Sequence, residues 1–327
     1  MKRKLASIQT VLEIHPIKRA DRIEVAVVMG WRCVVKKGEF VPGDTVIYCE
    51  VDSQFPEKPE FEFLRDYGFR VKTVKLRGQI SQGLCFSTDL LKDPNLPIGT
   101  DVTEQLGITQ YLPYAVEVDE NIIAAIPGYV SKTGEPRIQS YLDLLEEMRG
   151  VPCYVTTKVD GESGTFVHRE GDFFVCSHTS AFRETSDNKY WQAANRYKVP
   201  QWLPYLGNFA IQGEVAGSGI RKNRLGLDRV EFFCFNVYDI NEGRYYNFDE
   251  FLGFCQQHGL QTVPVDTPYV EFQYDLPELL KLAEGKYASG RQREGIVIRP
   301  TIEQHSEVLG SRMSFKVLNN QFLLKEE

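Results

Sequence analysis

The chain has 327 residues, 42% hydrophobic and 25% charged, an ordinary composition for a globular protein large enough for two domains. It holds no apolar run of about 18 residues and its charged start lacks an apolar core, which excludes a transmembrane helix and a signal peptide. The seven cysteines are scattered singly without a Cys-x-x-Cys, which excludes a zinc site or disulfide framework and favours reduced thiols in a cytoplasmic protein. The net charge of −7 is uneven, since residues 1–110 carry +1 and the remainder −8, and a local basic stripe would suffice for nucleic-acid binding.

The first part of the chain, about residues 1–110, reads as short strands separated by glycine and proline turns. The strand segments are 23–28, 31–35, 45–51, 70–76 and 83–86. Five such strands predict a small closed β-barrel of the OB type, which often binds nucleic-acid strands on one face. The turn-rich stretch 91–99 marks the end of this barrel.

The strand 70–76 and the residue after it are rich in basic side chains. Arg70, Lys72, Lys75 and Arg77 alternate imperfectly with apolar residues. We expect the apolar residues to face the barrel core and the basic ones to form a nucleic-acid-binding stripe, joined by Lys36 and Lys37. An ordinary solvated strand face is the alternative.

The stretch 154–163 reads as a strand that ends in a turn at Gly161. Lys158 and Asp160 should share a face, because alternate residues of a strand point the same way. A lysine nucleophile must lose its proton, so its pKa must be lowered by desolvation or a nearby cation. Asp160 could recruit that cation, directly or through water. By itself, a Lys-x-Asp-Gly string is also typical of a solvated surface turn.

Three further strands each place charge among apolar neighbours: 209–215 with Glu214, 293–299 with Glu294, and 313–318 with Lys316. Burying an unpaired charge is costly, so each of these side chains should have a partner. The stretch 230–239 reads as a buried strand that offers an aromatic surface. Helices are expected over 140–149, 187–198, 249–258 and 275–284, the last two starting at aspartate caps.

The order of these stretches resembles the covalent nucleotidyltransferases, which comprise ATP-dependent ligases and mRNA capping enzymes. Within them the chain is most similar to RNA ligases with an N-terminal OB domain, of the Deinococcus and Naegleria type. The segments that carry the resemblance are 158–161, 213–215, 232–238, 294–298 and 315–317, with support from 74–84, 132–139 and 217–223.

The resemblance implies an α+β protein with an OB-fold nucleic-acid-binding domain (1–112) and an adenylyltransferase domain (120–327). The second domain would have ATP-grasp-like antiparallel sheets with flanking helices. The implied activity is ATP-dependent RNA ligation at 3′-hydroxyl/5′-phosphate nicks, with AMP carried on Lys158 and Mg²⁺ or Mn²⁺ as metal. The implied partner is a nicked duplex with an RNA 3′-hydroxyl strand, bound by a monomer without a membrane.

The resemblance also implies roles for individual residues. Lys158 is the nucleophile, Glu214 contacts the ribose and helps to position metal-bound water, and Glu294 anchors the metal. Asp160 joins the metal set, Lys316 binds the α-phosphate, and Arg137 approaches the phosphate or ribose. Gly161 lies at the nucleotide, and Phe235 or a neighbour stacks on adenine.

The sequence departs from the family pattern in four places. His178 stands where an arginine is usual, so that Arg183 could take over its phosphate contact. Only Lys316 stands where many relatives have two lysines, with Arg312 nearby, and Gly134 replaces a common aspartate. The chain ends eleven residues after Lys316, without the C-terminal OB domain of DNA ligases and capping enzymes. The alternatives are a DNA ligase with rearranged domains and a non-catalytic nucleotide- or nucleic-acid-binding protein.

Overall fold

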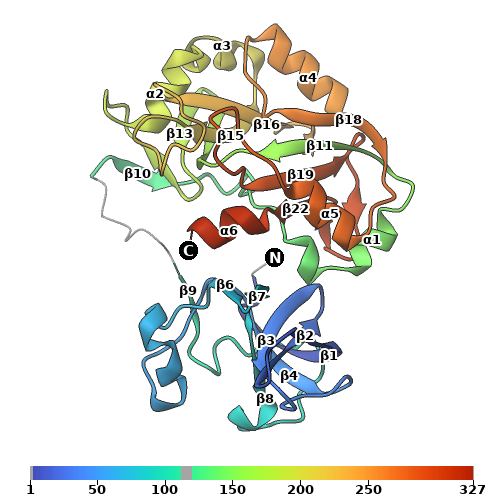
Figure 1. The fold of residues 1–327 in the computed structure, drawn as a ribbon. Helices are drawn as coiled ribbons and strands as arrows, with labels where there is room; N and C mark the ends of the chain where they lie inside the picture. The colour runs from blue at the N-terminus through green and yellow to red at the C-terminus, as the bar shows by residue number, and fades with distance from the viewer. Residues whose placement is uncertain (1–2, 112–119, 327) are drawn as a thin grey trace. The chain divides into compact units, whose positions relative to one another are not determined.

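The structure is a computed structural model that describes residues 3–111 and 120–326 (Figure 1). The chain folds into two compact units. The first unit comprises Met1–Ala115, Gln139–Leu142 and Leu323–Glu327, and the second comprises Val116–Ile138 and Asp143–Phe322. Helices and antiparallel strands are both present, which confirms the predicted α+β class.

The first unit is built on a five-stranded antiparallel sheet in the order β3-β2-β1-β4-β8. Its central strand β1 (Ala6–Pro16) has a bulge between Val11 and Glu13 and pairs with both neighbours. The other strands are β2 (Ile23–Val28), β3 (Trp31–Lys36), β4 (Thr45–Cys49) and β8 (Leu84–Ser87). The unit also contains a short pair, β5 (Ser53–Gln54) with β9 (Thr109–Gln110), and two 3-10 helices, η1 (Pro59–Tyr67) and η2 (Thr88–Leu90).

The predicted strand 70–76 is wrong in its first half and does not belong to this sheet. Among the residues that the structure describes, strand β6 (Thr73–Leu76) pairs only with β7 (Gln79–Gln82), in a separate hairpin closed at Arg77 and Gly78. Leu76 was expected to face the barrel core, but it is 38% exposed. The hairpin folds on itself because Arg77 and Gly78 adopt left-handed backbone angles that suit a two-residue turn.

The predicted basic stripe is therefore not one continuous face. Arg70 donates to Asp52 at 2.8 Å and lies over the ring of Tyr111 at 4.0 Å. Lys72 precedes the strand and is half-buried, while Lys75 and Arg77 are exposed at the end of the hairpin. Arg70, one of the four basic residues predicted to form the stripe, is therefore paired with Asp52 and does not belong to a shared basic face.

The second unit contains two large antiparallel sheets. The seven-stranded sheet runs β10 (Ile122–Ala125), β14 (Ser180–Phe182), β13 (Asp172–Cys176), β12 (Glu162–Arg169), β15 (Phe209–Ala216), β16 (Glu231–Asp239) and β17 (Arg244–Tyr245). The four-stranded sheet runs β18 (Val265–Glu271), β11 (Pro152–Lys158), β19 (Gly295–Pro300) and β22 (Phe315–Leu318). A small pair joins β20 (His305–Ser306) to β21 (Ser311–Arg312).

Helices flank these sheets. Figure 1 shows α2 (Lys189–Arg196), α3 (Val199–Leu206) and α4 (Phe248–Gln257) over the larger sheet, where their apolar side chains join one buried cluster with β12, β15 and β16. Helix α5 (Leu276–Ala283) packs on β19 and β22. The remaining helices are η3 (Ile138–Ser140), α1 (Asp143–Glu147) and α6 (Asn320–Glu326).

One predicted helix cap in the second unit is confirmed and one is wrong. Glu170 and Gly171, which both have positive φ, form a two-residue hairpin turn that joins β12 to β13. Asp275 caps α5 by accepting from the Glu278 backbone N–H at 2.8 Å, as expected. Helix α4 instead begins after Asn247, so the predicted Asp249 cap is wrong, and Asp249 lies in the first turn.

All seven cysteines are free thiols in the structure, and all except Cys85 are buried. Within the residues that the structure describes, no helix is long and apolar enough to cross a membrane.

Candidate active site

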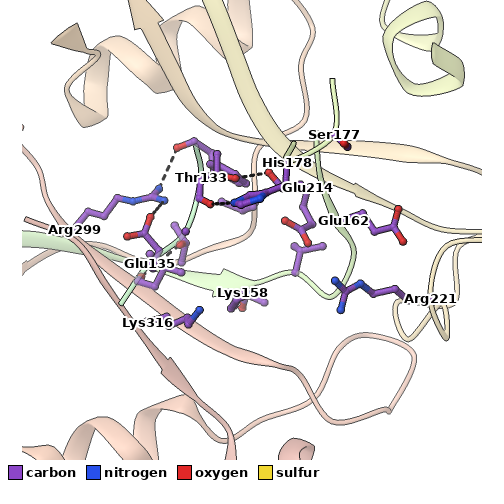
Figure 2. A pocket seen from close by; sticks show the side chains of 18 of the residues that line it. Thr133, Glu135, Lys158, Glu162, Ser177, His178, Glu214, Arg221, Arg299 and Lys316 are labelled. Atoms are coloured by element: carbon purple, nitrogen blue, oxygen red, sulfur yellow. Dashed lines mark hydrogen bonds and ion pairs between the residues drawn. The ribbon is translucent and has the colours of Figure 1, made fainter. Parts of the chain in front are cut away.

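A cavity of about 380 Å³ lies between the two large sheets of the second unit. Figure 2 shows Lys158 on its floor, with Glu214 and His178 facing it from the opposite wall. A volume of this size suits a small-molecule ligand. The cavity is lined by Thr133, Gly134, Glu135, Thr156, Thr157, Lys158, Val159, Glu162, Ser163, Ser177, His178, Tyr190, Glu214, Arg221, Phe235, Val263, Val297, Arg299 and Lys316.

Lys158 is the last residue of β11, and its side chain forms an ion pair with Glu294. The Nζ donates to Glu294 Oε2 at 2.7 Å, with side-chain exposures of 22% and 17%. Burial lowers the pKa of Lys158, but the attraction of the Glu294 and Glu214 carboxylates outweighs it and leaves the pKa raised. The lysine is therefore held as an ammonium, which is the unreactive form of an amine nucleophile.

Glu214 reaches the cavity from β15, in the other sheet. Burial raises the pKa of Glu214 to about 7, with the nearby Glu294 adding to the rise and Lys158 opposing it. Glu214 and Glu294 thus approach Lys158 from two different sheets. Such crowding of like charges is relieved by a cation, so these carboxylates could hold a divalent metal ion.

Asp160 is not among the cavity-lining residues, although it is two residues from Lys158. It is 5% exposed and pairs with Arg224, whose Nε lies 3.1 Å from Asp160 Oδ2. Burial and the neighbouring Glu294 raise the pKa of Asp160 despite this partner. In this geometry Asp160 supports the turn after Lys158 and does not face the cavity.

Gly161 allows that turn to approach β15. A Cβ at this position would lie 2.8 Å from Glu214 Cγ and would also collide with the carbonyl oxygen of Val215. Only glycine therefore fits between the lysine turn and the strand that carries Glu214. The Asp-Gly pair acts here as a close backbone contact inside the site and not as a solvated turn.

Tyr287 ties the two ends of the Lys158–Glu294 pair together. Its hydroxyl donates to the Lys158 carbonyl at 2.7 Å and accepts from the Glu294 backbone N–H at 3.1 Å. Burial raises its pKa, so it remains a neutral donor. Nothing in the sequence pattern pointed to this residue, because its partners are 129 and 7 residues away along the chain.

Phe235 is the aromatic residue of β16 that lines the cavity, whereas Phe232 and Phe233 are buried. Arg299 holds it in place: one guanidinium nitrogen donates to the Phe235 carbonyl at 3.1 Å, and the guanidinium lies 5.6 Å from the centre of the ring. Val297 lines the same cavity from β19. An adenine ring between an aromatic and an aliphatic side chain would gain stacking and apolar contact.

Arg299 also pairs with Glu135, at 2.7 Å, and donates to Ser314 Oγ at 3.1 Å. Arg299 is 3% exposed. Burial opposes ionisation of Glu135, but Arg299 and Arg312 hold the pKa of that carboxyl at about 2. This pair fixes the segment before β11 against the floor of the cavity. Arg312 itself pairs with Glu303 and donates to Asn236 at 2.7 Å.

Lys316 lines the cavity from β22, and its backbone N–H donates to the Pro136 carbonyl at 2.9 Å. Arg137 forms a parallel backbone bridge with Lys316, but is not among the described residues that line the cavity. His178 lines the cavity and its Nε2 donates to the Thr133 carbonyl at 2.7 Å. Arg183 does not line it.

Of the predicted site residues, the cavity lining contains Lys158, Glu214, Phe235 and Lys316. Glu294 does not line the cavity but reaches it through its ion pair with Lys158, and Asp160 and Arg137 lie outside the lining. The sequence reasoning missed Glu162, Tyr190, Arg221, Tyr287 and the role of Arg299. For Glu162 the sequence did offer a signal, because this residue directly follows Gly161 and lies four residues after Lys158. The sequence pattern gave no such signal for the other four residues.

The residues present fit a hydrated divalent ion. Carboxylate oxygens are hard ligands of the kind that Mg²⁺ and Mn²⁺ prefer, and Mg²⁺ usually keeps several waters. No group of three or more His, Cys, Asp or Glu that would hold a metal directly occurs in residues 3–111 and 120–326. Glu214 and Glu294 would therefore hold the ion largely through its water molecules.

A lysine beneath carboxylates, an aromatic side chain and a second lysine is an arrangement suited to covalent nucleotidyl transfer. A family model described as RNA ligase matches residues 151–318, and one described as an OB-fold domain matches residues 5–88. The comparison with curated proteins gave no match. Among solved structures the chain is similar to Naegleria gruberi RNA ligase variants with AMP and Mn and with ATP and Mn, and to that ligase with pyrophosphate.

The sequence identity to these structures is 34% and the TM-score is 0.90. The matches cover 98–99% of this chain and 99% of the Naegleria chain. The chain belongs to the RNA ligase family.

Proposed function

We propose that this protein is an ATP-dependent RNA ligase that seals 3′-hydroxyl/5′-phosphate nicks in RNA repair through a lysyl-AMP intermediate. The observation that carries the proposal is the position of Lys158 in the cavity, between Glu294 and Glu214 and within a family whose Naegleria member was solved with ATP, AMP and Mn. Family membership favours this function over the DNA ligase alternative. The complete set of charged side chains around Lys158 favours it over a non-catalytic binding protein.

In the first step, the lone pair of Lys158 Nζ attacks the α-phosphorus of ATP, and the bond to pyrophosphate breaks. Adenine stacks on Phe235, Glu214 contacts the ribose, and Lys316 offsets the charge that grows on the α-phosphate oxygens. Gly161 keeps the lysine turn close to Glu214, and Arg137 acts from beside the cavity by holding the backbone of Lys316.

A hydrated Mg²⁺ or Mn²⁺ held by Glu294 and Glu214 would favour the neutral, reactive amine of Lys158 by charge repulsion. Asp160 contributes indirectly, because its pair with Arg224 fixes the turn that follows the nucleophile.

AMP then passes to the 5′-phosphate end of a nicked duplex, and the 3′-hydroxyl attacks that end to release AMP. The first unit, including Lys72, Lys75 and Arg77, would contact the duplex backbone, where phosphate contacts position without reading sequence. We further propose that the protein acts as a monomer in the cytoplasm, where its seven free thiols would stay reduced.

A panel of nicked duplexes tests this function. The nicks differ only in the sugar on the 3′-hydroxyl side and on the 5′-phosphate side, and sealing is followed by gel with ATP and Mg²⁺. We expect sealing only where the 3′-hydroxyl strand ends in ribose, with DNA tolerated on the 5′-phosphate side. Equal sealing of an all-DNA nick would support the DNA ligase alternative, and failure to form any AMP adduct would support the binding-protein alternative.

A further inference from the structure

Arg221 is a cation in the cavity lining that has no role in the proposed attack of Lys158 on ATP. Among the described residues, the lysines and arginines that line the cavity are Lys158, Arg221, Arg299 and Lys316. Arg299 is occupied by Glu135, Ser314 and the Phe235 carbonyl, and Lys158 pairs with Glu294. Within the described part of the chain, no direct hydrogen bond or ion pair joins the Arg221 guanidinium to another residue. Burial lowers the pKa of Arg221, but attraction from four nearby carboxylates outweighs it and leaves the pKa raised; these belong to Glu294, Glu214, Asp160 and Glu162.

The loop that carries Arg221 is held firmly in place. Arg221 and Asn223 have φ angles of 44° and 41°, a left-handed conformation that non-glycine residues adopt at a cost. Arg291 donates to the Lys222 carbonyl at 2.9 Å, and Asn223 exchanges two hydrogen bonds with the Leu227 backbone. The next arginine, Arg224, pairs with Asp160. The fold therefore presents the Arg221 side chain to the cavity from a rigid loop.

Arg221 and Arg299 lie on opposite sides of Lys158 (Figure 2). Because Arg299 lies over the Phe235 ring, its side of the cavity is the base end. AMP attached to Lys158 would extend from Phe235 to the lysine. Figure 2 shows Glu162 on the same side of Lys158 as Arg221, and the Tyr190 hydroxyl donates to Glu162 at 3.0 Å. Arg221 thus faces the end of the cavity beyond the adenosine, where a group that approaches the AMP phosphorus from solvent would arrive.

Resting on the proposed function, we propose that Arg221 binds the terminal 5′-phosphate of the strand that receives AMP. In that step an oxygen of the 5′-phosphate attacks the phosphorus of lysyl-AMP and forms a new P–O–P linkage. The P–N bond to Lys158 breaks, and its electron pair returns to Nζ, which takes up a proton. A guanidinium can bind a terminal phosphate with two parallel hydrogen bonds, which would orient the attacking oxygen.

The test compares Arg221→Ala with Lys222→Ala, which removes the same charge from the adjacent residue outside the cavity. Both residues already carry a Cβ, so the alanine at 221 adds no new backbone strain. Three quantities are measured on the full-length protein: the rate of lysyl-AMP formation from ATP, the rate of AMP transfer to a 5′-phosphate nick, and the affinity for nicks with 5′-phosphate or 5′-hydroxyl ends.

For Arg221→Ala we expect AMP transfer to fall by about tenfold or more, since a charge-assisted contact is lost. Lysyl-AMP formation should fall by less, because the charge of Arg221 only opposes the rise in the pKa of Lys158 from a distance. The wild-type preference for 5′-phosphate over 5′-hydroxyl nicks should disappear, and Arg221→Lys should restore part of it. Lys222→Ala should leave both rates and the preference unchanged.

An unchanged preference for the 5′-phosphate in folded Arg221→Ala would overturn the proposal. An equal loss in lysyl-AMP formation would also overturn it, because Arg221 would then serve the phosphates of ATP. If the wild-type protein forms no lysyl-AMP, the proposed function itself fails, which is a separate outcome. Thermal unfolding of each variant identifies any loss that comes from misfolding.

Discussion

Lys158 Nζ lies 2.7 Å from Glu294 Oε2, so the nucleophile and the carboxylate expected to bind metal are partners of each other in this structure. Their attraction keeps the pKa of Lys158 raised in spite of burial. The same carboxylate that would activate the lysine by holding a cation therefore restrains it when no cation is present. ATP binding without metal should leave the amine protonated.

The first prediction concerns the nucleophile. Lys158→Ala should abolish the AMP adduct with ATP and Mg²⁺, because no other group would form the P–N bond. Intact mass after incubation is the measurement. Lys132→Ala, which removes an exposed lysine near but outside the cavity, should label normally. NAD should not replace ATP in either protein. An adduct of normal yield on the Lys158→Ala protein would contradict the assignment.

The second prediction concerns the metal. Glu294→Ala and Glu214→Ala should each slow adduct formation by orders of magnitude, because each removes a charge that positions metal or nucleotide. Chelation of divalent ions should stop labelling of the wild-type protein, and Mg²⁺ or Mn²⁺ should restore it. Glu242→Ala, in an exposed turn, is the matched control. A wild-type rate in either of the first two variants would show that its carboxylate is dispensable.

The third prediction concerns Tyr287, whose hydroxyl links the Lys158 carbonyl to the Glu294 backbone N–H. Tyr287→Phe should slow adduct formation by roughly tenfold, because it loosens the Lys158–Glu294 pair. The ATP concentration needed for half-maximal rate should change little, because Tyr287 does not contact the adenine. The rate is measured at a series of ATP concentrations. Tyr269→Phe, which removes an exposed hydroxyl bonded to Asp249, should have no effect. If Tyr287→Phe forms the adduct as fast as Tyr269→Phe and wild type, Tyr287 does not position the Lys158–Glu294 pair for the reaction.

The sequence predicted the strands that carry Lys158, Glu214 and Lys316, because each shows apolar residues around one charge. It also predicted the Asp275 cap. It could not give Tyr287 or Arg299 their roles, because both act through backbone atoms of residues distant along the chain. Asp160 was expected at the metal, yet burial of its carboxylate required a partner, and Arg224 supplies it.

The first unit was harder to predict. Strand β1 mixes polar and apolar residues because it pairs on both edges and twists through a bulge, so it shows no simple alternation. The basic residues around β6 suggested one strand face, but Arg70 is drawn to Asp52 and the chain turns back at Gly78. The neighbouring strands of β1 and the Asp52 partner of Arg70 determine these two structures, and none of them can be inferred from the local sequence pattern.

The fourth prediction concerns acid stability. The pKa of Glu135 is held at about 2, below its ordinary value of 4.5, so its stabilisation is present above about pH 4.5 and is lost as pH falls toward 2. Glu135→Gln should lower the free energy of unfolding by roughly 3 kcal/mol at pH 7, and the difference from wild type should shrink at about pH 3.5. Urea denaturation at both pH values measures this. Glu146→Gln, an exposed partner of Arg149, should change little. A Glu135→Gln difference that stays constant with pH would contradict the depressed pKa.

The fifth prediction concerns the hairpin of β6 and β7. Lys75 and Arg77 are exposed at its end and Lys72 is half-buried beside it, so their charges can reach a nucleic-acid backbone. Lys72→Glu combined with Lys75→Glu should spare lysyl-AMP formation, because Lys158 and the residues around it belong to the second unit. Sealing of a 5′-phosphate nick should weaken, and the dependence of nick binding on salt should flatten, since phosphate contacts release counterions. Lys92→Glu, an exposed charge elsewhere in the first unit, is the matched control. A folded double variant that seals like wild type at every salt concentration would show that this hairpin takes no part in substrate binding.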